Sequence, residues 1–261
     1  MTVEVGDASS VTLRTGPPTR EELLVHYPAK FTWEQLKTFV NSGDLGLLKR
    51  DKKLQERYVV WTAGIKQEYG SIVNYLLNHR LQWGKPDTYS MLPSAFRDEP
   101  DNRTEGSDDI SPTYFSSNTP DKYVSIIQND WPYSEIEHSL VWTKIPIFHP
   151  QIISPAIAPR IEQDGLWGFT GNTSPPPSPS NLVFCLPALA EWGVTKDTMI
   201  VSQKGTEEEE VLVRQAGRHV QEYIQRKWKE TEWETAWFVN PPRLQSVPGL
   251  AHIHVFAKRK S

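Results

Sequence analysis

The chain has 261 residues, of which 38% are hydrophobic and 23% charged, with a formal net charge of −4 and a pI near 6.0. Such a length allows one large domain or two small ones with a buried core, and we expect no nucleic-acid partner because no concentrated Lys/Arg stripe is present. The single cysteine, Cys185, excludes an internal disulfide, and no run of about 18 apolar residues predicts a membrane span. We therefore expect a soluble protein of the cytoplasm, or of the cytoplasm and nucleus.

The first predicted elements are a tail and a short helix. Residues 1–27 are polar and contain proline, so we expect a loose N-terminal tail. A capping box at Thr32 and Gln35 predicts a helix over 33–41, which ends at Ser42-Gly43.

The longest helix of the first half is predicted over residues 52–80. Gly64 and Gly70 weaken it intrinsically, so tertiary packing must hold it. Its apolar side chains recur every three or four positions, which indicates one buried stripe and a structural helix. The stripe consists of Tyr58, Trp61, Ile65, Tyr69, Ile72, Tyr75 and Leu76.

Two β-rich segments, 123–128 and 138–144, follow a loop insertion at about 86–120 that is rich in Pro, Asp, Ser and Asn. The proline-punctuated stretch 146–182 predicts a second peripheral, irregular loop. A more apolar segment over 181–192 comes next, and residues 199–202 are a candidate short strand.

A second strong helix is predicted over 207–229, with acidic residues in its first turn and basic residues in its last. Two strands, 235–239 and 251–256, flank a proline-rich turn. Together these elements predict a single α+β domain over 28–261. Its mostly antiparallel sheet would carry packed helices and an N-terminal helical layer.

Four segments of the chain together resemble the N-acetylglucosamine-induced protein 1 family, which is known mainly from fungi. They share the family's order and several of its tryptophans. The resemblance implies a context of amino-sugar response and no particular reaction. The segments are 31–36, 65–71, 129–144 and 240–248.

The C-terminal half also resembles histidine-triad (HIT) nucleotide-binding domains. These carry an Asp that holds a ribose, a His eight residues later and a Lys six residues beyond, as Asp130, His138 and Lys144 do here. After a helix they present a strand that ends in Asn, then Gln-Ser-Val, then a strand with His-x-His-x-His. The matching residues here are Asn240, Gln245, Ser246, Val247, His252 and His254.

The departures from the HIT pattern leave two registers open. The turn holds prolines where glycines would let backbone amides approach a phosphate, and one of the three histidines is missing. In the preferred register Leu250 replaces the first His, and His252 is the nucleophile. In the other register Phe256 is the substitute and His254 the nucleophile.

The resemblance implies a nucleotidyl hydrolase or transferase that acts on a nucleotide conjugate, which the inducer suggests is a nucleotide sugar. His252 would attack phosphorus, and His254 would donate to a phosphate oxygen. Asn240 would orient the leaving group, and Asp130 would hold the ribose. The full set of expected ligand-binding residues is Asp130, Trp131, Tyr133, His138, Lys144, Asn240, Gln245 and Ser246.

Other interpretations remain open at this stage. A His-x-His strand is commonly structural, residues 129–133 are compatible with a simple turn, and a strand-end lysine is commonly solvated. Loss of one histidine is compatible with a ligand-binding or regulatory protein without turnover. A zinc site would need His138 or His149 as further ligands. We expect no metal, because a zinc site needs three or four ligands, and no cofactor, because P-loop and Rossmann motifs are absent. The nucleophile-elbow motif of serine hydrolases is absent too.

Overall fold

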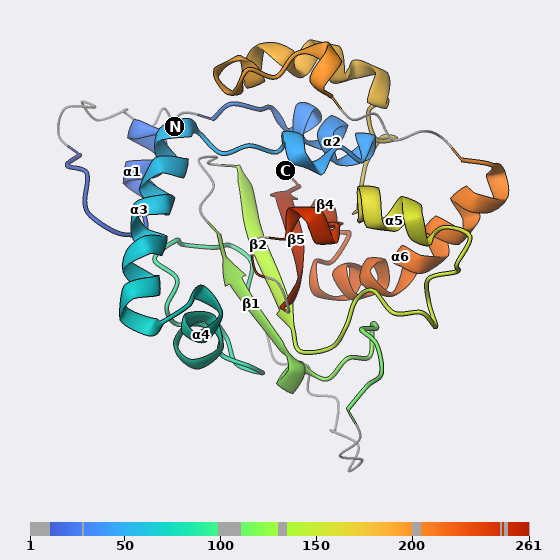
Figure 1. Cartoon of the computed structure of the whole chain (residues 1–261), viewed down its shortest axis with the longest axis horizontal. Coiled ribbons are helices and arrows are strands. Elements are labelled where there is room, and N and C mark those ends of the chain that lie inside the picture. The colour runs from blue at the N-terminus through green and yellow to red at the C-terminus, as the bar shows by residue number, and fades with distance from the viewer. Residues whose placement is uncertain are drawn as a thin grey trace.

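An antiparallel sheet forms the centre of the chain in this computed structural model (Figure 1). The structure describes residues 11–27, 29–98, 111–129, 135–199, 205–245, 247 and 250–260. Every neighbouring strand pair is antiparallel, in the order β1-β2-β5-β4-β3. The expected α+β class is therefore confirmed. The strands are β1 (Val124–Gln128), β2 (Ile136–Thr143), β3 (Leu166–Thr170), β4 (Trp233–Val239) and β5 (Ala251–Arg259).

One face of the sheet is covered by α6 (Glu207–Lys227) and α5 (Ala158–Asp164), on the right of Figure 1. Thr206 and Glu209 form a capping box at the start of α6, and its first turn carries four glutamates that suit the helix macrodipole. Buried side chains of α6 and of the sheet form one large apolar cluster. The predicted helix is confirmed, although it ends at Lys227.

The opposite face carries α2 (Trp33–Ser42), which begins at the predicted capping box of Thr32 and Gln35. Gly43 ends it in the left-handed conformation, with φ of 75°. Trp33, Leu36 and Val40 bury their side chains with those of Ile136, Ala236, Phe238 and Phe256. The predicted N-terminal helical layer thus lies directly on the sheet.

The predicted helix over 52–80 is divided in the structure. It consists of α3 (Lys52–Tyr69), α4 (Ile72–Tyr75) and a π-helical turn (Leu76–Arg80). Gly70, with φ of 77°, ends α3. Of the predicted buried stripe only Ile65 and Leu76 are buried, and the other members are half-buried. The expectation of one structural stripe was wrong, because most of these side chains line a cavity.

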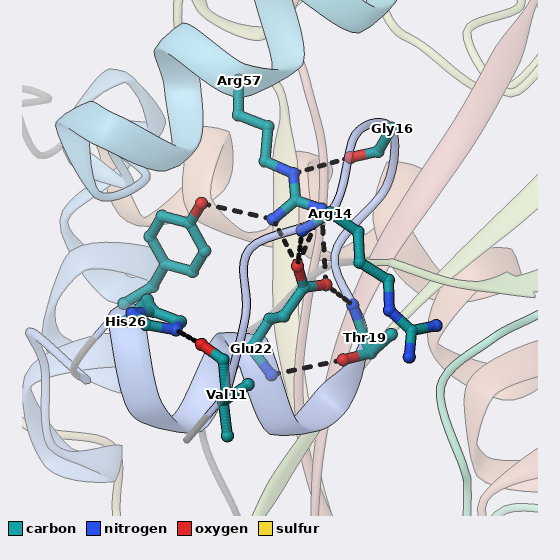
Figure 2. Close-up of polar contacts among 8 residues, drawn as sticks. Val11, Arg14, Gly16, Thr19, Glu22, His26 and Arg57 are labelled. Atoms are coloured by element: carbon teal, nitrogen blue, oxygen red, sulfur yellow. Dashed lines mark hydrogen bonds and ion pairs between the residues drawn. The ribbon is translucent and has the colours of Figure 1, made fainter. Parts of the chain in front are cut away.

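The N-terminal segment is not a loose tail over residues 11–27, where it forms α1 (Arg20–His26). The Glu22 carboxylate accepts hydrogen bonds from the backbone N–H groups of Arg14 and Thr19, and it pairs with Arg57 of α3 (Figure 2). Leu23 and Tyr27 pack with Leu54. A buried ion pair and apolar contacts therefore hold a segment whose composition predicted disorder.

The stretch 146–182 is more ordered than its prolines predicted, because it contains α5 and the edge strand β3. A Cβ added at Gly168 would lie 2.6 Å from the Trp237 ring, so glycine lets β3 approach β4 closely. Beyond it a 3₁₀ helix (Pro179–Trp192) contacts α2 through Leu182, Cys185 and Leu189. The other 3₁₀ helices are Leu45–Leu47, Asp121–Tyr123, Lys196–Thr198 and Pro242–Leu244.

Two predictions fall partly outside the described residues. The insertion at 86–120 has no helix or strand over 86–98 and 111–120. Phe96 nevertheless stacks on Trp228 with the ring centroids 4.2 Å apart, so this end of the loop is packed. The candidate strand at 199–202 lies outside the described residues except for Met199.

Candidate active site

Strand β5 gives its two faces different side chains. Ile253, Val255 and Ala257 belong to the apolar cluster under α6. The alternating residues His252, His254 and Phe256 therefore lie on the other face, towards α2 and α3. The antiparallel register places His254 between Leu140 of β2 and Phe238 of β4. The predicted pair of same-face histidines is thus present in the centre of the sheet.

A cavity of about 620 Å³ adjoins the two histidines. Its walls come from the sheet, from α3 and α4, and from the loop before α3; Figure 1 shows α3 and α4 beside β1 and β2. The volume lies within the range of small-molecule sites. Its lining includes Arg50, Tyr58, Trp61, Trp142, His252 and His254.

His252 has a defined tautomer. Its ring is 5% exposed and stacks on Trp142 with the centroids 4.3 Å apart. Nδ1 lies 3.3 Å from the carbonyl oxygen of Leu250, which can only accept, so Nδ1 carries the proton. The lone pair is therefore on Nε2, which has no hydrogen-bond partner among the described residues. Burial lowers the pKa of His252 below its ordinary value, against the opposing effect of the Leu250 hydrogen bond.

His254 belongs to a chain of four hydrogen-bonded side chains. Its Nδ1 lies 3.0 Å from Nε2 of His138, and its Nε2 lies 3.2 Å from the amide nitrogen of Asn240. At the other end, Nδ1 of His138 lies 3.2 Å from the amide nitrogen of Asn129. Both nitrogens of His254 are thus engaged by protein groups, which leaves none for a phosphate oxygen and disfavours His254 as nucleophile.

The two rings of this chain are neutral. Burial holds the pKa of His138 well below its ordinary value, with further lowering by the charges of Arg50 and His252. Burial likewise lowers the pKa of His254, as do His252, His138 and Arg50. Each neutral ring has one donor and one acceptor nitrogen, so one end of the pair donates and the other accepts. Of Asn129 and Asn240, one therefore donates its side-chain N–H to a ring nitrogen, and the other accepts from a ring N–H with its side-chain oxygen.

The structure separates the other predicted ligand-binding residues. His138 is buried behind His254 and does not line the cavity. Gln245 donates to the Asn240 carbonyl at 3.3 Å. Lys144 is exposed past the end of β2, with its ammonium 4.7 Å from the Trp83 ring, and does not join the cavity. The remaining candidates, Asp130, Trp131, Tyr133 and Ser246, lie outside the described residues.

Several cavity residues were not singled out from the sequence. Asn129 lies one residue before the predicted Asp130, and Trp142 lies within a predicted strand, but neither position carried a signal of its own. Arg50 comes from the loop before α3 and is far from the histidines in sequence. The three- and four-residue spacing of Tyr58 and Trp61 was recognised, but it does not distinguish a core face from a cavity wall.

The N-terminal segment supplies part of the cavity wall through Gly16, Pro17 and Pro18. Arg57 donates from Nε to the Gly16 carbonyl at 2.6 Å and pairs with Glu22 (Figure 2). Although burial raises the pKa of Glu22, hydrogen bonds from the Arg14 and Thr19 backbone and from Arg57 lower it to about 2. The wall is therefore fixed to α3 by an ionised carboxylate at neutral pH.

Within the described ranges, no group of three or more His, Cys, Asp or Glu is arranged to hold a metal ion. His149, considered for a zinc site, has its ring against Tyr114 and does not line the cavity. No helix over the same residues is long and apolar enough to cross a bilayer.

Comparison with known proteins gives a family and one distant relative. N-acetylglucosamine-induced protein 1 of Candida albicans (strain SC5314 / ATCC MYA-2876) is 25% identical over 120 residues, which are 45% of this chain and 44% of that protein. The chain thus spans less than half the length of this relative. No solved structure matches it. Residues 32–157 and 195–258 match the family described as "Protein of unknown function (DUF3605)", so the chain belongs to that family.

Proposed function

We propose that the chain is a HIT-like nucleotidyl hydrolase or transferase, with His252 as its nucleophile and a nucleotide conjugate such as a nucleotide sugar as its substrate. The observation that carries this proposal is the state of His252. Its proton is held on Nδ1 by the Leu250 carbonyl, its Nε2 has no hydrogen-bond partner among the described residues, and the residue lines a cavity of about 620 Å³. A neutral imidazole held in this tautomer is suited to attack on phosphorus.

The reaction would proceed in two displacements. Nε2 of His252 forms a bond to phosphorus while the bond between phosphorus and the leaving group breaks, and the leaving group departs with that electron pair and takes up a proton. A water or alcohol oxygen then attacks phosphorus, loses its proton to solvent, and returns the N–P electron pair to Nε2. His254 acts as a positioning residue, because its ring nitrogens are held by His138 and Asn240.

The resemblance to HIT domains supports this assignment through three features. The sheet has five antiparallel strands, α6 covers the face away from the histidines, and the histidines alternate on the last strand. Leu250 occupies the position of one triad histidine. A different histidine, His138 of β2, is hydrogen-bonded to His254. The amino-sugar context in the name of the Candida albicans relative supports a nucleotide sugar.

The test is the covalent intermediate. The protein would be incubated with nucleoside phosphoramidates and nucleotide sugars, quenched at alkaline pH and analysed by intact mass spectrometry. We expect a nucleotidyl adduct, its absence in His252→Ala, and its retention in His149→Ala, which removes a histidine outside the cavity. An adduct that persists in His252→Ala contradicts the assignment.

A ligand-binding protein without turnover is the second candidate, and one observation favours it. Both nitrogens of His254 are occupied, so the site lacks the phosphate donor expected from that histidine. In this case nucleotide conjugates bind with micromolar affinity, while neither adduct nor product forms. That outcome rejects the enzyme and retains the cavity as a binding site.

A further inference from the structure

Within the described residues, the cavity beside His252 carries positive charge that no carboxylate of its lining offsets. Its described lining includes Arg50, Arg57 and Arg80 and no aspartate or glutamate. Arg57 is paired with Glu22, and Arg80 forms two hydrogen bonds of 2.7 and 2.8 Å with Asp87. Arg50 has no carboxylate partner among the described residues. Among the described residues, Arg50 is therefore the cavity arginine whose charge no carboxylate offsets.

Two buried donors in this cavity have no acceptor in the described part of the chain. One is Nη1 of Arg50, and the other is the indole Nε1 of Trp142. Trp142 is 4% exposed, so its N–H has lost water without gaining a protein partner. Leaving such a donor unsatisfied is unfavourable, and a bound acceptor would recover that cost. Arg50 and Trp142 both line the cavity that His252 lines, and Trp142 stacks on that histidine.

An aromatic wall continues from Arg50. Its guanidinium carbon lies 4.4 Å from the centre of the Tyr58 ring. Tyr58 and Trp61 are 5.7 Å apart between ring centroids, and Trp61 and Tyr75 are 5.8 Å apart. These rings are half-buried cavity residues, so a flat group could stack against them without displacing the core.

We propose that Arg50 and Trp142 form a phosphate subsite next to His252, and that the aromatic wall of Tyr58, Trp61 and Tyr75 holds a planar base attached to that phosphate. The ligand class is a nucleoside phosphate bound through its anion and its ring. The role of the subsite in group transfer rests on the proposed function, because the phosphate would be the group that His252 attacks. Binding of the phosphate itself needs no reaction.

The experiment measures equilibrium binding of AMP, UMP, adenosine and inorganic phosphate by calorimetry. Wild-type protein is expected to bind the nucleotides more tightly than adenosine. Arg50→Gln should weaken AMP binding by about 10- to 100-fold, because a charged hydrogen bond to the phosphate is lost. Adenosine binding should be nearly unchanged, because adenosine has no phosphate. Arg218→Gln, an exposed change on α6 with the same loss of charge, should leave AMP binding unchanged.

Two further variants separate the parts of the site. Trp142→Phe keeps a ring against His252 and removes the N–H, so AMP binding should weaken by about 5- to 10-fold. Trp61→Ala should weaken AMP and adenosine to a similar extent. Urea unfolding of each variant confirms that the fold is retained.

The subsite is rejected if wild-type protein binds none of the anions at millimolar concentration, if adenosine binds as tightly as AMP, or if Arg50→Gln binds AMP like the wild type. His252→Ala separates this result from the proposed reaction. If His252→Ala forms no adduct but still binds AMP as tightly as the wild type, both proposals are supported. AMP binding by a wild-type protein that forms no adduct supports the subsite and rejects catalysis.

Discussion

The two faces of β5 differ in the surroundings of their side chains: one face packs in the apolar core, and the other adjoins a cavity. Towards α6, Ile253, Val255 and Ala257 are at most 1% exposed and pack in one apolar cluster. Towards α3, His252 and His254 adjoin a cavity of about 620 Å³, and two of its residues, Arg50 and Trp142, carry a buried donor with no acceptor among the described residues. The α6 face stabilises the fold by burying apolar surface, whereas the cavity side buries polar groups that this part of the protein does not pair.

On the proposed function, stability and chemistry are separated by the pleat of a single strand. Successive side chains of a strand point to opposite faces, so residues next to each other in sequence serve different purposes. The separation is testable, because equal changes on the two faces should have unequal effects.

The largest expected effect on stability comes from Trp237→Ala on the α6 face. Trp237 is 1% exposed within the apolar cluster, so its truncation should cost about 4 kcal/mol of unfolding free energy. The matched change Trp61→Ala on the cavity wall should cost about 1 kcal/mol, because that ring is only half-buried. Urea unfolding measures both. Equal losses would contradict the division between the faces.

A smaller effect is expected from Glu22→Gln, which breaks the ion pair between the N-terminal segment and α3. Its carboxylate is 1% exposed, and its loss leaves Arg57 without its charge partner, which should cost about 3 kcal/mol. Glu135→Gln is the control, because its pair with Lys258 is exposed and should contribute less than about 0.5 kcal/mol. If both variants unfold at the wild-type urea concentration, the N-terminal segment is not anchored by this pair.

The mildest test is the pH dependence of stability. The pKa values of His138, His252 and His254 are lowered in the folded state from an ordinary value of 6.5. Their contribution is therefore complete above about pH 6.5 and is lost as the pH falls towards the folded values, because the unfolded chain takes up protons first. The slope should reach about 1.4 kcal/mol per pH unit for each proton taken up.

Urea unfolding between pH 8 and 5 measures this slope, and His138→Phe should reduce it. Glu22 acts in a separate window, because its pKa is lowered from 4.5 to about 2 and its contribution is lost between those values. Stability that does not change from pH 7 to 5 would contradict the lowered pKa values of the histidines.

Local signals in the sequence predicted much of the fold. The capping box at Thr32 and the charge pattern of α6 specify helices through contacts within one or two turns, and both helices were found. Strand β3 was not predicted, because its pairing depends on Gly168 meeting Trp237 across nearly 70 positions of sequence. Tertiary packing outweighed the local preference of a proline-rich stretch.

The candidate site shows the same limit. Alternation on a strand sufficed to place His252 and His254 on one face. The hydrogen bonds of His254 with His138 and Asn240 depend on which strands are neighbours in the sheet. The spacing of residues along the sequence does not predict that strand order. Arg50 was missed because a lone arginine in a loop carries no periodic or motif signal.

The N-terminal wall of the cavity has a consequence for how selectivity is encoded. Gly16, Pro17 and Pro18 precede the family match, which begins at residue 32, whereas His252, Trp142 and Arg50 lie within it. On the proposed function, this N-terminal segment would contact part of the ligand, and the ion pair of Glu22 with Arg57 holds the segment to α3. Exchanging the segment between relatives would then change the size of the ligand admitted and leave the proposed nucleophile on β5 unaltered.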